Sequence, residues 1–209
     1  MYLFSSEIMD RTAFSAGGLY KPIITPNRSH EINQFSISMS KISSSKIQDR
    51  IKEFEHQQME RKSSFKYDMN TGGPSEEREV DISKAIAGFM NASGGILYVG
   101  VDKDGNASGL DMDYTFVKNK NQDGFELELR NSIRKYLKIT DDLYRIRFHK
   151  ISETDICEVM VRPSFMPVLL YHKDKISFFV RQGNSTQPLG LAEILNHCQR
   201  HFWSYNIQI

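Results

Sequence analysis

The feature that most constrains the fold is a helix, a glycine turn and a strand that follow one another in residues 75–102. Ser75 precedes Glu76, Glu77 and Glu79, and a hydroxyl followed by acids is typical of a helix N-terminus. The segment EEREVDISKAIAGFMNA then carries apolar residues at helical spacing, and SGG ends it. The apolar run ILYVGVD predicts a buried strand, and the DKDG that follows predicts a hairpin turn.

The flanking segments also divide into helices and strands. SKIQDRIKEFEHQ has Ile47, Ile51 and Phe54 at helical spacing, which predicts a helix that ends near Gln57. MERKSSFKY alternates as a strand, with odd-numbered residues on one side and even-numbered residues on the other. Later patterns predict a helix in GFELELRNSIRKYLK, a hairpin of YRIRFHKI and DICEVMVRP, a strand in KISFFVR and a closing helix in LAEILNHCQRHF. This order predicts an α+β fold in which helices flank a mixed β-sheet.

Length and composition fit one folded domain that follows an extension. A chain of 209 residues with 39% hydrophobic and 25% charged residues is typical of a globular protein. Residues 1–46 differ from the rest, because serine is frequent there and the short apolar pieces are interrupted by Gly, Pro and Asn. We expect residues 1–46 to be an N-terminal extension that packs on the domain or on a partner, and residues 47–209 to form the domain.

Charge and cysteine content narrow the classes of function. The net charge of +1 argues against a protein that coats polyanions indiscriminately. Basic residues gather in 130–138 and 144–150, so a nucleic-acid partner stays open. Cys157 and Cys198 have the spacing of neither a disulfide framework nor a zinc site, and they suit free thiols in a reducing cytoplasm. No apolar run reaches the ~18 residues of a membrane span, so we expect a cytoplasmic protein without a membrane partner.

Three acidic residues and one lysine are the candidate catalytic residues. Clustered carboxylates can bind a hard cation that activates water and neutralises charge developing on a phosphate. Glu55 and Glu60 lie five residues apart, and Asp102 ends the predicted buried strand on the same face as Gly100, which leaves room for a ligand. Lys62 shares a strand face with Glu60, where its ammonium could orient water or bind the scissile phosphate.

A purely structural interpretation of these residues is also open. Glu55 could cap a solvated helix end, and Glu60 could pair with Lys62 or Lys66 on an exposed strand. Residues DKDGNASGLDMD resemble a calcium loop, but their glycine falls at the fourth position and not the sixth, which favours a hairpin turn.

The stretch from Glu55 to about Trp203 resembles the Schlafen AlbA-like domain. That family has a Glu, four residues and then EFK on a strand, and this chain has Glu55, HQQM and ERK, with Arg61 where Phe is usual. SSFKYDM is similar to the SSFRWDL of one prokaryotic branch. KAIAGFMNASGGILYVGVDKDGNASGL, NKNQDGFELELR and FFVRQGNSTQPL complete the family pattern in order. The resemblance implies a fold like one half of a Schlafen core.

The resemblance also implies a function. In Schlafen ribonucleases three acidic residues hold a divalent metal, and the matching positions here are Glu55, Glu60 and Asp102, which would bind Mg²⁺ or Mn²⁺. The expected activity is a metal-dependent endoribonuclease that cuts structured RNA such as tRNA, in antiviral defence or a stress response. The alternative is a non-catalytic regulatory module that binds DNA or RNA. Either interpretation is compatible with a homo-oligomer.

A further set of basic and polar residues is predicted to contact the nucleic-acid backbone. In RQGNST, which leaves a predicted strand, an arginine could hold a phosphate and neighbouring polar groups could add contacts. The alternative is a turn that caps the last helix, and for the other basic residues a solvated face. The candidates are Lys66, Arg134, Lys135, Arg145, Arg147, Lys150, Arg162, Arg181, Asn184 and Ser185.

Overall fold

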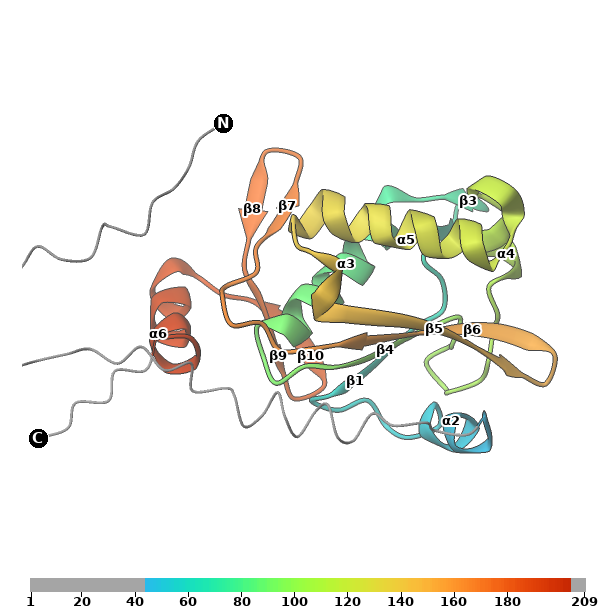
Figure 1. The fold of residues 1–209 in the computed structure, drawn as a ribbon, viewed down its shortest axis with the longest axis horizontal. Coiled ribbons are helices and arrows are strands. Elements are labelled where there is room, and N and C mark those ends of the chain that lie inside the picture. Colours follow the sequence, from blue (N-terminus) through green and yellow to red (C-terminus); the bar gives the residue numbers. More distant parts are fainter. Residues whose placement is uncertain (1–43, 204–209) are drawn as a thin grey trace, which may run out of the picture.

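A four-stranded mixed β-sheet organises the chain in the computed structural model, which describes residues 44–203 (Figure 1). The strand order is β1-β4-β6-β5. Strands β1 (Met59–Lys62) and β4 (Gly95–Val99) run parallel, whereas β6 (Thr154–Val161) is antiparallel both to β4 and to β5 (Tyr144–Ile151). Helices flank this sheet, so the α+β class predicted from the sequence is confirmed.

Two long helices, α3 (Glu76–Met90) and α5 (Gln122–Leu137), lie together on one side of the sheet, as Figure 1 shows. The main hydrophobic core contains Leu97 and Val99 of β4 and apolar residues of both helices, among them Ile82, Ile86, Phe89, Phe125, Leu129 and Ile133. Because these residues recur at helical spacing, each helix buries one apolar face against the sheet.

The predicted helix, glycine turn and strand form at the expected place. Helix α3 begins at Glu76 and β4 begins at Gly95. Gly94 has a φ of +74°, and a Cβ there would lie 2.7 Å from the carbonyl oxygen of Val161, so the turn requires glycine. The helix start differs in one detail: Ser75 Oγ donates to the Glu77 carboxylate at 3.0 Å and makes no capping bond to a helix N–H.

Helix α2 (Ser44–Arg50) covers the opposite face of the sheet. Ile47 and Ile51 are buried there in a second apolar cluster with residues of the sheet such as Tyr98. The helix ends well before Gln57, so the predicted boundary is wrong. The backbone carbonyl of Ile51 accepts a bond from Arg61 Nη1 at 2.9 Å, and the chain then turns so that Phe54 is 92% exposed.

The strand predicted over residues 59–67 ends at Lys62. Phe65 packs in the main core, on the face opposite Met59, so the predicted alternation does not continue. The cause is Asp113 in α4 (Asp111–Thr115), whose buried carboxylate accepts the consecutive backbone N–H groups of residues 65–67 at 2.6–3.2 Å. These bonds bend the chain away from the sheet. It then forms the short hairpin of β2 (Tyr67–Asp68) and β3 (Gly73–Pro74).

Two small hairpins and a helix follow β6. Strand β7 (Leu170–His172) pairs with β8 (Lys175–Ser177), and β9 (Phe179–Gln182) pairs with β10 (Ser185–Pro188). KISFFVR, predicted as one strand, is therefore divided between β8 and β9. Phe178 at the division is buried in a third apolar cluster that includes residues of α6 (Leu191–His201). Single-turn 3₁₀ helices occur at Lys118–Lys120 and Asp141–Leu143.

A buried asparagine holds the β9–β10 hairpin beside the end of α3. Asn91 Nδ2 donates to the carbonyls of Val168 (2.8 Å) and Phe179 (2.9 Å), and Asn91 Oδ1 accepts the N–H of Val168 at 2.8 Å. All polar groups of this amide are thus engaged with backbone. The hairpin is thereby placed next to α3.

The remaining sequence predictions have mixed outcomes. Cys157 and Cys198 are free and buried, as predicted. Within residues 44–203, no helix has the length and apolar character to cross a membrane. The extension predicted for residues 1–46 lies outside the described residues except for its last three, which begin α2.

Candidate functional site

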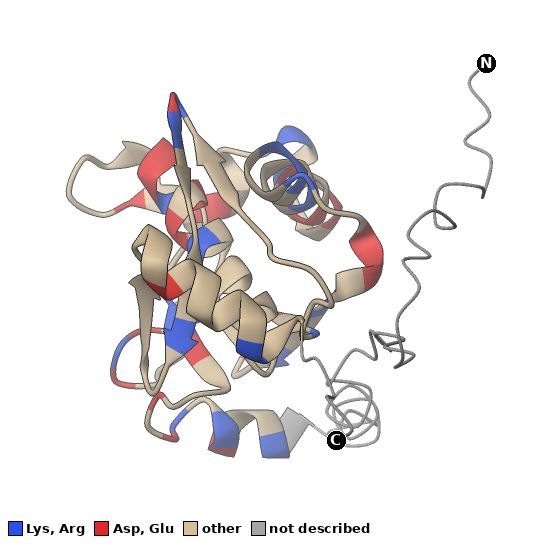
Figure 2. Ribbon diagram, turned by 90° about the vertical axis from the view of Figure 1, so that its left-hand side faces the viewer, with Lys and Arg blue, Asp and Glu red and all other residues tan. Residues whose placement is uncertain are grey.

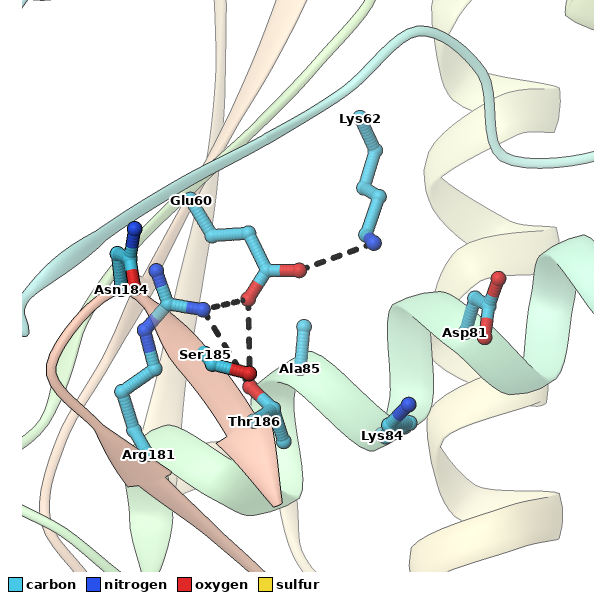
Figure 3. Close-up of a pocket in the computed structure, with 9 residues that line it drawn as sticks. All are labelled: Glu60, Lys62, Asp81, Lys84, Ala85, Arg181, Asn184, Ser185 and Thr186. Carbon is cyan, nitrogen blue, oxygen red and sulfur yellow. Dashed lines mark hydrogen bonds and ion pairs between the residues drawn. The ribbon is translucent and has the colours of Figure 1, made fainter. Parts of the chain in front are cut away.

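A polar pocket lies between β1, α3 and the β9–β10 hairpin (Figure 3). It has a volume of about 180 Å³ and is open to solvent on one side. All of its lining side chains except one alanine are polar or charged: Glu60, Lys62, Asp81, Lys84, Ala85, Arg181, Asn184, Ser185 and Thr186. Such a lining suits a charged or strongly polar ligand and not an apolar one.

Glu60 occupies the centre of this pocket. Its carboxylate lies between two cations, as Figure 3 shows: Oε1 is 3.0 Å from Lys62 Nζ, and Oε2 accepts a bond from Arg181 Nη1. The hydroxyl of Thr186 also donates to Oε2, at 3.3 Å. The pairing of Glu60 with Lys62 agrees with the structural interpretation of the sequence. That interpretation also expected an exposed strand, whereas Glu60 is nearly buried.

Arg181 is buried and joins the hairpin to β1. Its Nη2 donates to the carbonyls of His56 (3.1 Å) and Met59 (2.8 Å), while Nη1 bonds to Glu60. Burial lowers the pKa of Arg181, and the Glu60 carboxylate opposes that shift. An arginine stays charged under these conditions, so its charge is matched by Glu60. The predicted phosphate contact of Arg181 does not agree with this geometry, because the guanidinium is bound to the protein itself.

Other donors in the pocket remain available to a ligand. Lys62 has about a third of its side chain exposed and uses one bond for Glu60. Lys84 lies on α3 with its Nζ 5.3 Å from the ring centroid of Phe179, and no carboxylate among residues 44–203 pairs with it. Asn184 lies in the turn of the hairpin and Ser185 begins β10. These groups converge from three elements that are distant in sequence. The alternative from the sequence, a turn here that caps the last helix, is wrong, because the N-cap of α6 is Gly190.

Sequence reasoning missed Lys84 and Asp81. They lie three residues apart on α3, on the helix face that also carries Gly88. A Cβ at Gly88 would lie 2.6 Å from Thr186 Cγ2, so this glycine allows the hairpin to approach the helix. A glycine inside the last turn of a predicted helix is the available signal, since it can mark close packing on its face.

A second, larger pocket of about 570 Å³ adjoins the first. Lys62 and Asn184 line both pockets, so the two lie side by side. The second pocket contains the other two predicted acids together with exposed apolar and basic residues. Its lining is Phe54, Glu55, Arg61, Lys62, Ser63, Met69, Arg78, Val101, Asp102, Lys103 and Asn184.

Glu55 and Arg61 fix the chain at the start of β1. Glu55 Oε1 accepts the backbone N–H of Arg61 at 2.9 Å and lies 3.9 Å from its Nε. The Arg61 side chain is almost buried and donates to the carbonyl of Ile51 at the end of α2. The arginine that replaces the usual phenylalanine thus has a structural contact with α2.

Asp102 closes the hairpin turn that the sequence predicts. Its Oδ1 accepts the N–H groups of Asp104 (2.9 Å) and Asn106 (2.8 Å), and Oδ2 accepts from Asn106 Nδ2 at 3.1 Å. These bonds, with the backbone bond from Asn106 the largest, lower the pKa of Asp102. The carboxylate is therefore already used within its own turn.

The strand face predicted for Asp102 is wrong because of a bulge. The N–H groups of Gly100 (2.8 Å) and Val101 (3.2 Å) both donate to the carbonyl of Lys62, so two residues oppose one. Gly100 has a φ of +85°. After the bulge, Val101 and not Gly100 packs in the cluster that contains Tyr98, and the alternation shifts by one residue.

The three predicted metal ligands do not meet in this fold. Glu60 lies in the first pocket between two cations, whereas Glu55 and Asp102 line the second pocket and bond to backbone N–H groups. Within the described part of the chain, no three His, Cys, Asp or Glu residues are grouped so that they could hold a metal ion. As folded, this donor set does not fit Mg²⁺ or Mn²⁺, which need several oxygen ligands around one point.

Most of the predicted basic residues lie away from the pockets. Neither pocket is lined by Lys66, Arg134, Lys135, Arg145, Arg147, Lys150 or Arg162. Four of them pair with carboxylates: Lys66 with Glu128 (2.9 Å), Arg134 with Asp141 (2.9 Å), Lys135 with Glu76 (3.0 Å) and Lys150 with Glu153 (3.5 Å). Arg145, Arg147 and Lys150 lie on β5, three strands from β1 and so roughly 14 Å away. Figure 2 accordingly shows basic and acidic segments interspersed over the ribbon.

Comparison with known proteins places the chain in a family. A family model described as Schlafen, AlbA_2 matches residues 55–190, which is well over half of the chain. The chain belongs to the Schlafen AlbA_2 family. The matched range contains every residue that lines the first pocket and, of the second pocket, all except Phe54.

A solved structure supports the fold of this AlbA_2 domain. The DIP2311 protein from Corynebacterium diphtheriae matches with a TM-score of 0.50 and 17% identity, over 86% of this chain and 34% of that one. At this identity the likeness is one of fold, and the chain spans about a third of that protein's length. No curated protein matches the chain.

Proposed function

We propose that this Schlafen AlbA_2 domain is a nucleic-acid-binding module that holds a backbone phosphate in the first pocket. The observation that supports this most is the convergence of Lys62 and Lys84, from β1 and α3, with the hairpin residues Asn184 and Ser185 around one polar pocket. Phosphates of nucleic acids are contacted mainly by lysine, arginine and short polar side chains of this kind.

The electrostatic balance of the pocket agrees with a single phosphate. Glu60 and Arg181 neutralise each other within the wall, and Lys62 keeps two further N–H groups for a ligand. Lys84 adds a charge without a carboxylate partner among the described residues, and Asp81 on the same helix face subtracts one. A modest excess of positive charge fits one phosphate contact better than a long polyanion track.

Salt dependence of binding tests this proposal. Affinity for a labelled single-stranded RNA, measured by fluorescence anisotropy at several salt concentrations, should fall with salt. In the variants Lys62→Met and Lys84→Met, the plot of the logarithm of affinity against the logarithm of salt concentration should be less steep. Its slope should decrease in magnitude by about 0.7 for each lost phosphate contact. Asp81→Asn should strengthen binding, because it removes the opposing charge.

A matched control comes from β5, where the sequence alone predicted phosphate contacts. Lys150→Met removes the same charge from the same type of side chain at the far edge of the sheet. We expect its slope to equal that of the wild type. If Lys150→Met lowers the slope and Lys62→Met does not, phosphates bind on β5 and the pocket assignment is wrong.

The metal-dependent endoribonuclease that cuts structured RNA such as tRNA, in defence or stress, is the second candidate. It is favoured by the retained acids of the family pattern and by the contact of Glu60 with Lys62 inside the pocket. Because the three acids do not fit one ion as folded, we derive no metal-dependent step. The two buried free cysteines support a reducing, cytoplasmic location for either function.

A cleavage assay separates the two candidates. The protein is incubated with tRNA, rRNA fragments and single-stranded DNA in the presence of Mg²⁺ or Mn²⁺. Cleavage that Asp102→Ala or Glu60→Gln abolishes, with RNA binding retained, would establish the nuclease. Substrates that are bound and left intact would establish the binding module.

A further inference from the structure

Two large apolar side chains are exposed in the second pocket. Phe54 is 92% exposed and Met69 is 73% exposed, and both line this pocket. Single exposed apolar residues are common on protein surfaces. Here, however, an aromatic ring and a thioether share one pocket, which is the composition of a surface for a flat apolar ligand.

The position of Phe54 follows from fixed contacts on both sides of it. The carbonyl of Ile51 is held by Arg61 Nη1 (2.9 Å), and Glu55 is held by the backbone N–H of Arg61 (2.9 Å). The chain between these anchors has little choice of path, so the ring is presented to solvent by defined structure. Phe54 is also the one lining residue of this pocket outside the family match.

Met69 is presented by a similarly fixed turn. The β2–β3 turn is closed by a bond from Gly72 N to the carbonyl of Asp68 at 2.8 Å. The Asp68 carboxylate accepts the N–H of Asn70 (3.0 Å) and lies 3.3 Å from Arg78 Nη2. Arg78 itself lines the second pocket. The turn is thus bonded to the pocket wall, and Met69 is its first residue after β2.

The pocket adjoins the proposed phosphate site and is lined by more basic than acidic residues. Lys62 and Asn184 line both pockets, so a strand with a phosphate in the first has the second beside it for a neighbouring group. The second pocket has four basic residues against two acidic ones, and both acids already accept backbone N–H groups. Its volume of about 570 Å³ is within the usual range for small-ligand pockets.

We infer that the second pocket binds an unpaired nucleobase of the strand whose phosphate lies in the first pocket, with the base stacked on Phe54 beside Met69. The inference rests on the proposed nucleic-acid binding and specifies its substrate class. Bases in a duplex are stacked on each other and cannot reach such a surface, whereas bases of single strands, loops and bulges can stack on aromatic side chains. The domain therefore selects unpaired over fully paired nucleic acid.

The test compares one RNA strand, alone and in a perfect duplex, with wild type and Phe54→Ala. Loss of a stacking aromatic weakens binding of a base by about 5- to 150-fold, and we expect a loss in this range for the single strand only. The salt slope should stay at the wild-type value because no charge is removed. Phe54→Trp should retain the affinity, and Ile176→Ala, an exposed apolar residue on β8, should change nothing.

A strand with an abasic site provides a second measurement. Removing the base that stacks should lower the affinity of the wild-type protein by the same factor as Phe54→Ala lowers the affinity for the intact strand. The Phe54→Ala variant should lose nothing further on the abasic strand. An equal additional loss in both proteins would overturn the stacking.

The outcomes distinguish this inference from the proposed function. If Phe54→Ala binds the single strand as the wild type does while Lys62→Met is impaired, the base site is wrong and the phosphate site stands. If Phe54→Ala weakens the binding of the single strand and of the duplex equally, the proposed selection of unpaired over paired nucleic acid is also wrong. If it changes only the oligomeric state in size-exclusion chromatography, the surface binds a second copy of the chain. If no nucleic acid binds the wild type, the proposed function itself fails.

Discussion

At the scale of single residues, the pair of Glu60 and Arg181 is the centre of the site. The two residues are 121 positions apart in sequence, and their side chains are 9% and 1% exposed. A buried charge without its partner is costly, because the protein interior solvates it poorly. The same pair therefore shapes the pocket and stabilises the contact between β1 and the hairpin.

We expect either partner alone to be poorly replaceable. Glu60→Gln should lower the free energy of unfolding by about 3–5 kcal/mol, because it leaves the buried charge of Arg181 unpaired. Arg181→Met should cost less, because Lys62 still pairs with Glu60. The double variant should lose much less than the sum of the two losses. Urea denaturation of all four proteins gives this coupling energy directly. Single variants within 0.5 kcal/mol of the wild type, with additive effects, would show that the pair is not a stabilising unit.

At the scale of secondary-structure elements, the site depends on how closely the hairpin approaches α3. Gly88 is the contact point, since a Cβ there would lie 2.6 Å from Thr186 Cγ2 and 3.5 Å from the backbone N of Arg181. Thr186 has a short, β-branched side chain with few alternative positions. The hydroxyl of Thr186 also bonds to Glu60, so the spacing of these elements and the geometry of the pocket are linked.

Gly88→Ala should therefore destabilise the protein although alanine favours helices. The gain in helix propensity is about 1 kcal/mol, whereas overpacking typically costs 1–3 kcal/mol. We expect a net loss of stability in urea denaturation and weaker binding of single-stranded RNA. The double variant Gly88→Ala with Thr186→Ser removes the clashing methyl group and keeps the hydroxyl, so it should recover most of both losses. A Gly88→Ala variant more stable than the wild type would contradict this account of the contact.

At the scale of the whole molecule, ion pairs around α5 join parts of the fold that are distant in sequence. Glu76 at the start of α3 accepts bonds from Lys135 Nζ (3.0 Å) and Tyr136 Oη (2.9 Å), and Lys135 leads in holding the pKa of Glu76 at about 2. The bond from Arg134 likewise lowers the pKa of Asp141 to about 2. These pairs are largely exposed, so salt should weaken them.

The pH dependence of stability follows from these shifts. Both carboxylates have a lower pKa in the folded state than in the unfolded chain, where it is about 4. Their contribution to the free energy of unfolding is therefore complete above that value and is lost as the pH falls towards 2. We expect the urea midpoint to fall between pH 5 and pH 2, and to fall less in the variant with Glu76→Gln and Asp141→Asn. If the urea midpoint falls equally with decreasing pH in the variant and the wild type, other carboxylates control acid unfolding.

The extension predicted for residues 1–46 and the homo-oligomer left open by the sequence stay predictions at this scale. Sedimentation of the full chain and of a variant without residues 1–46, each alone and with single-stranded RNA, measures the oligomeric state and shows whether the extension contributes to it. It also shows whether one strand binds one copy or more.

The sequence alone determined the parts of the molecule that depend on local pattern. The helix, glycine turn and strand from Glu76 to Val99 follow from acids in the first helical turn, apolar spacing and a glycine with positive φ. The α+β class follows from the order of such segments, and the family follows from the motifs between residues 55 and 190 that resemble it. These signals are readable because each arises from residues within a few positions of one another.

Only the tertiary structure decided which side chains meet. The bulge at Gly100 and the bend caused by Asp113 each break a strand alternation that sequence spacing alone extends too far. The pairing of Glu60 with Arg181 and the exposure of Phe54 likewise depend on contacts made by distant segments. The contacts of a side chain depend on which distant segments pack next to it, and a local sequence pattern carries no information about those segments. For this reason the sequence pattern selects the three acids as candidates, whereas their separation into two pockets is visible only in the fold.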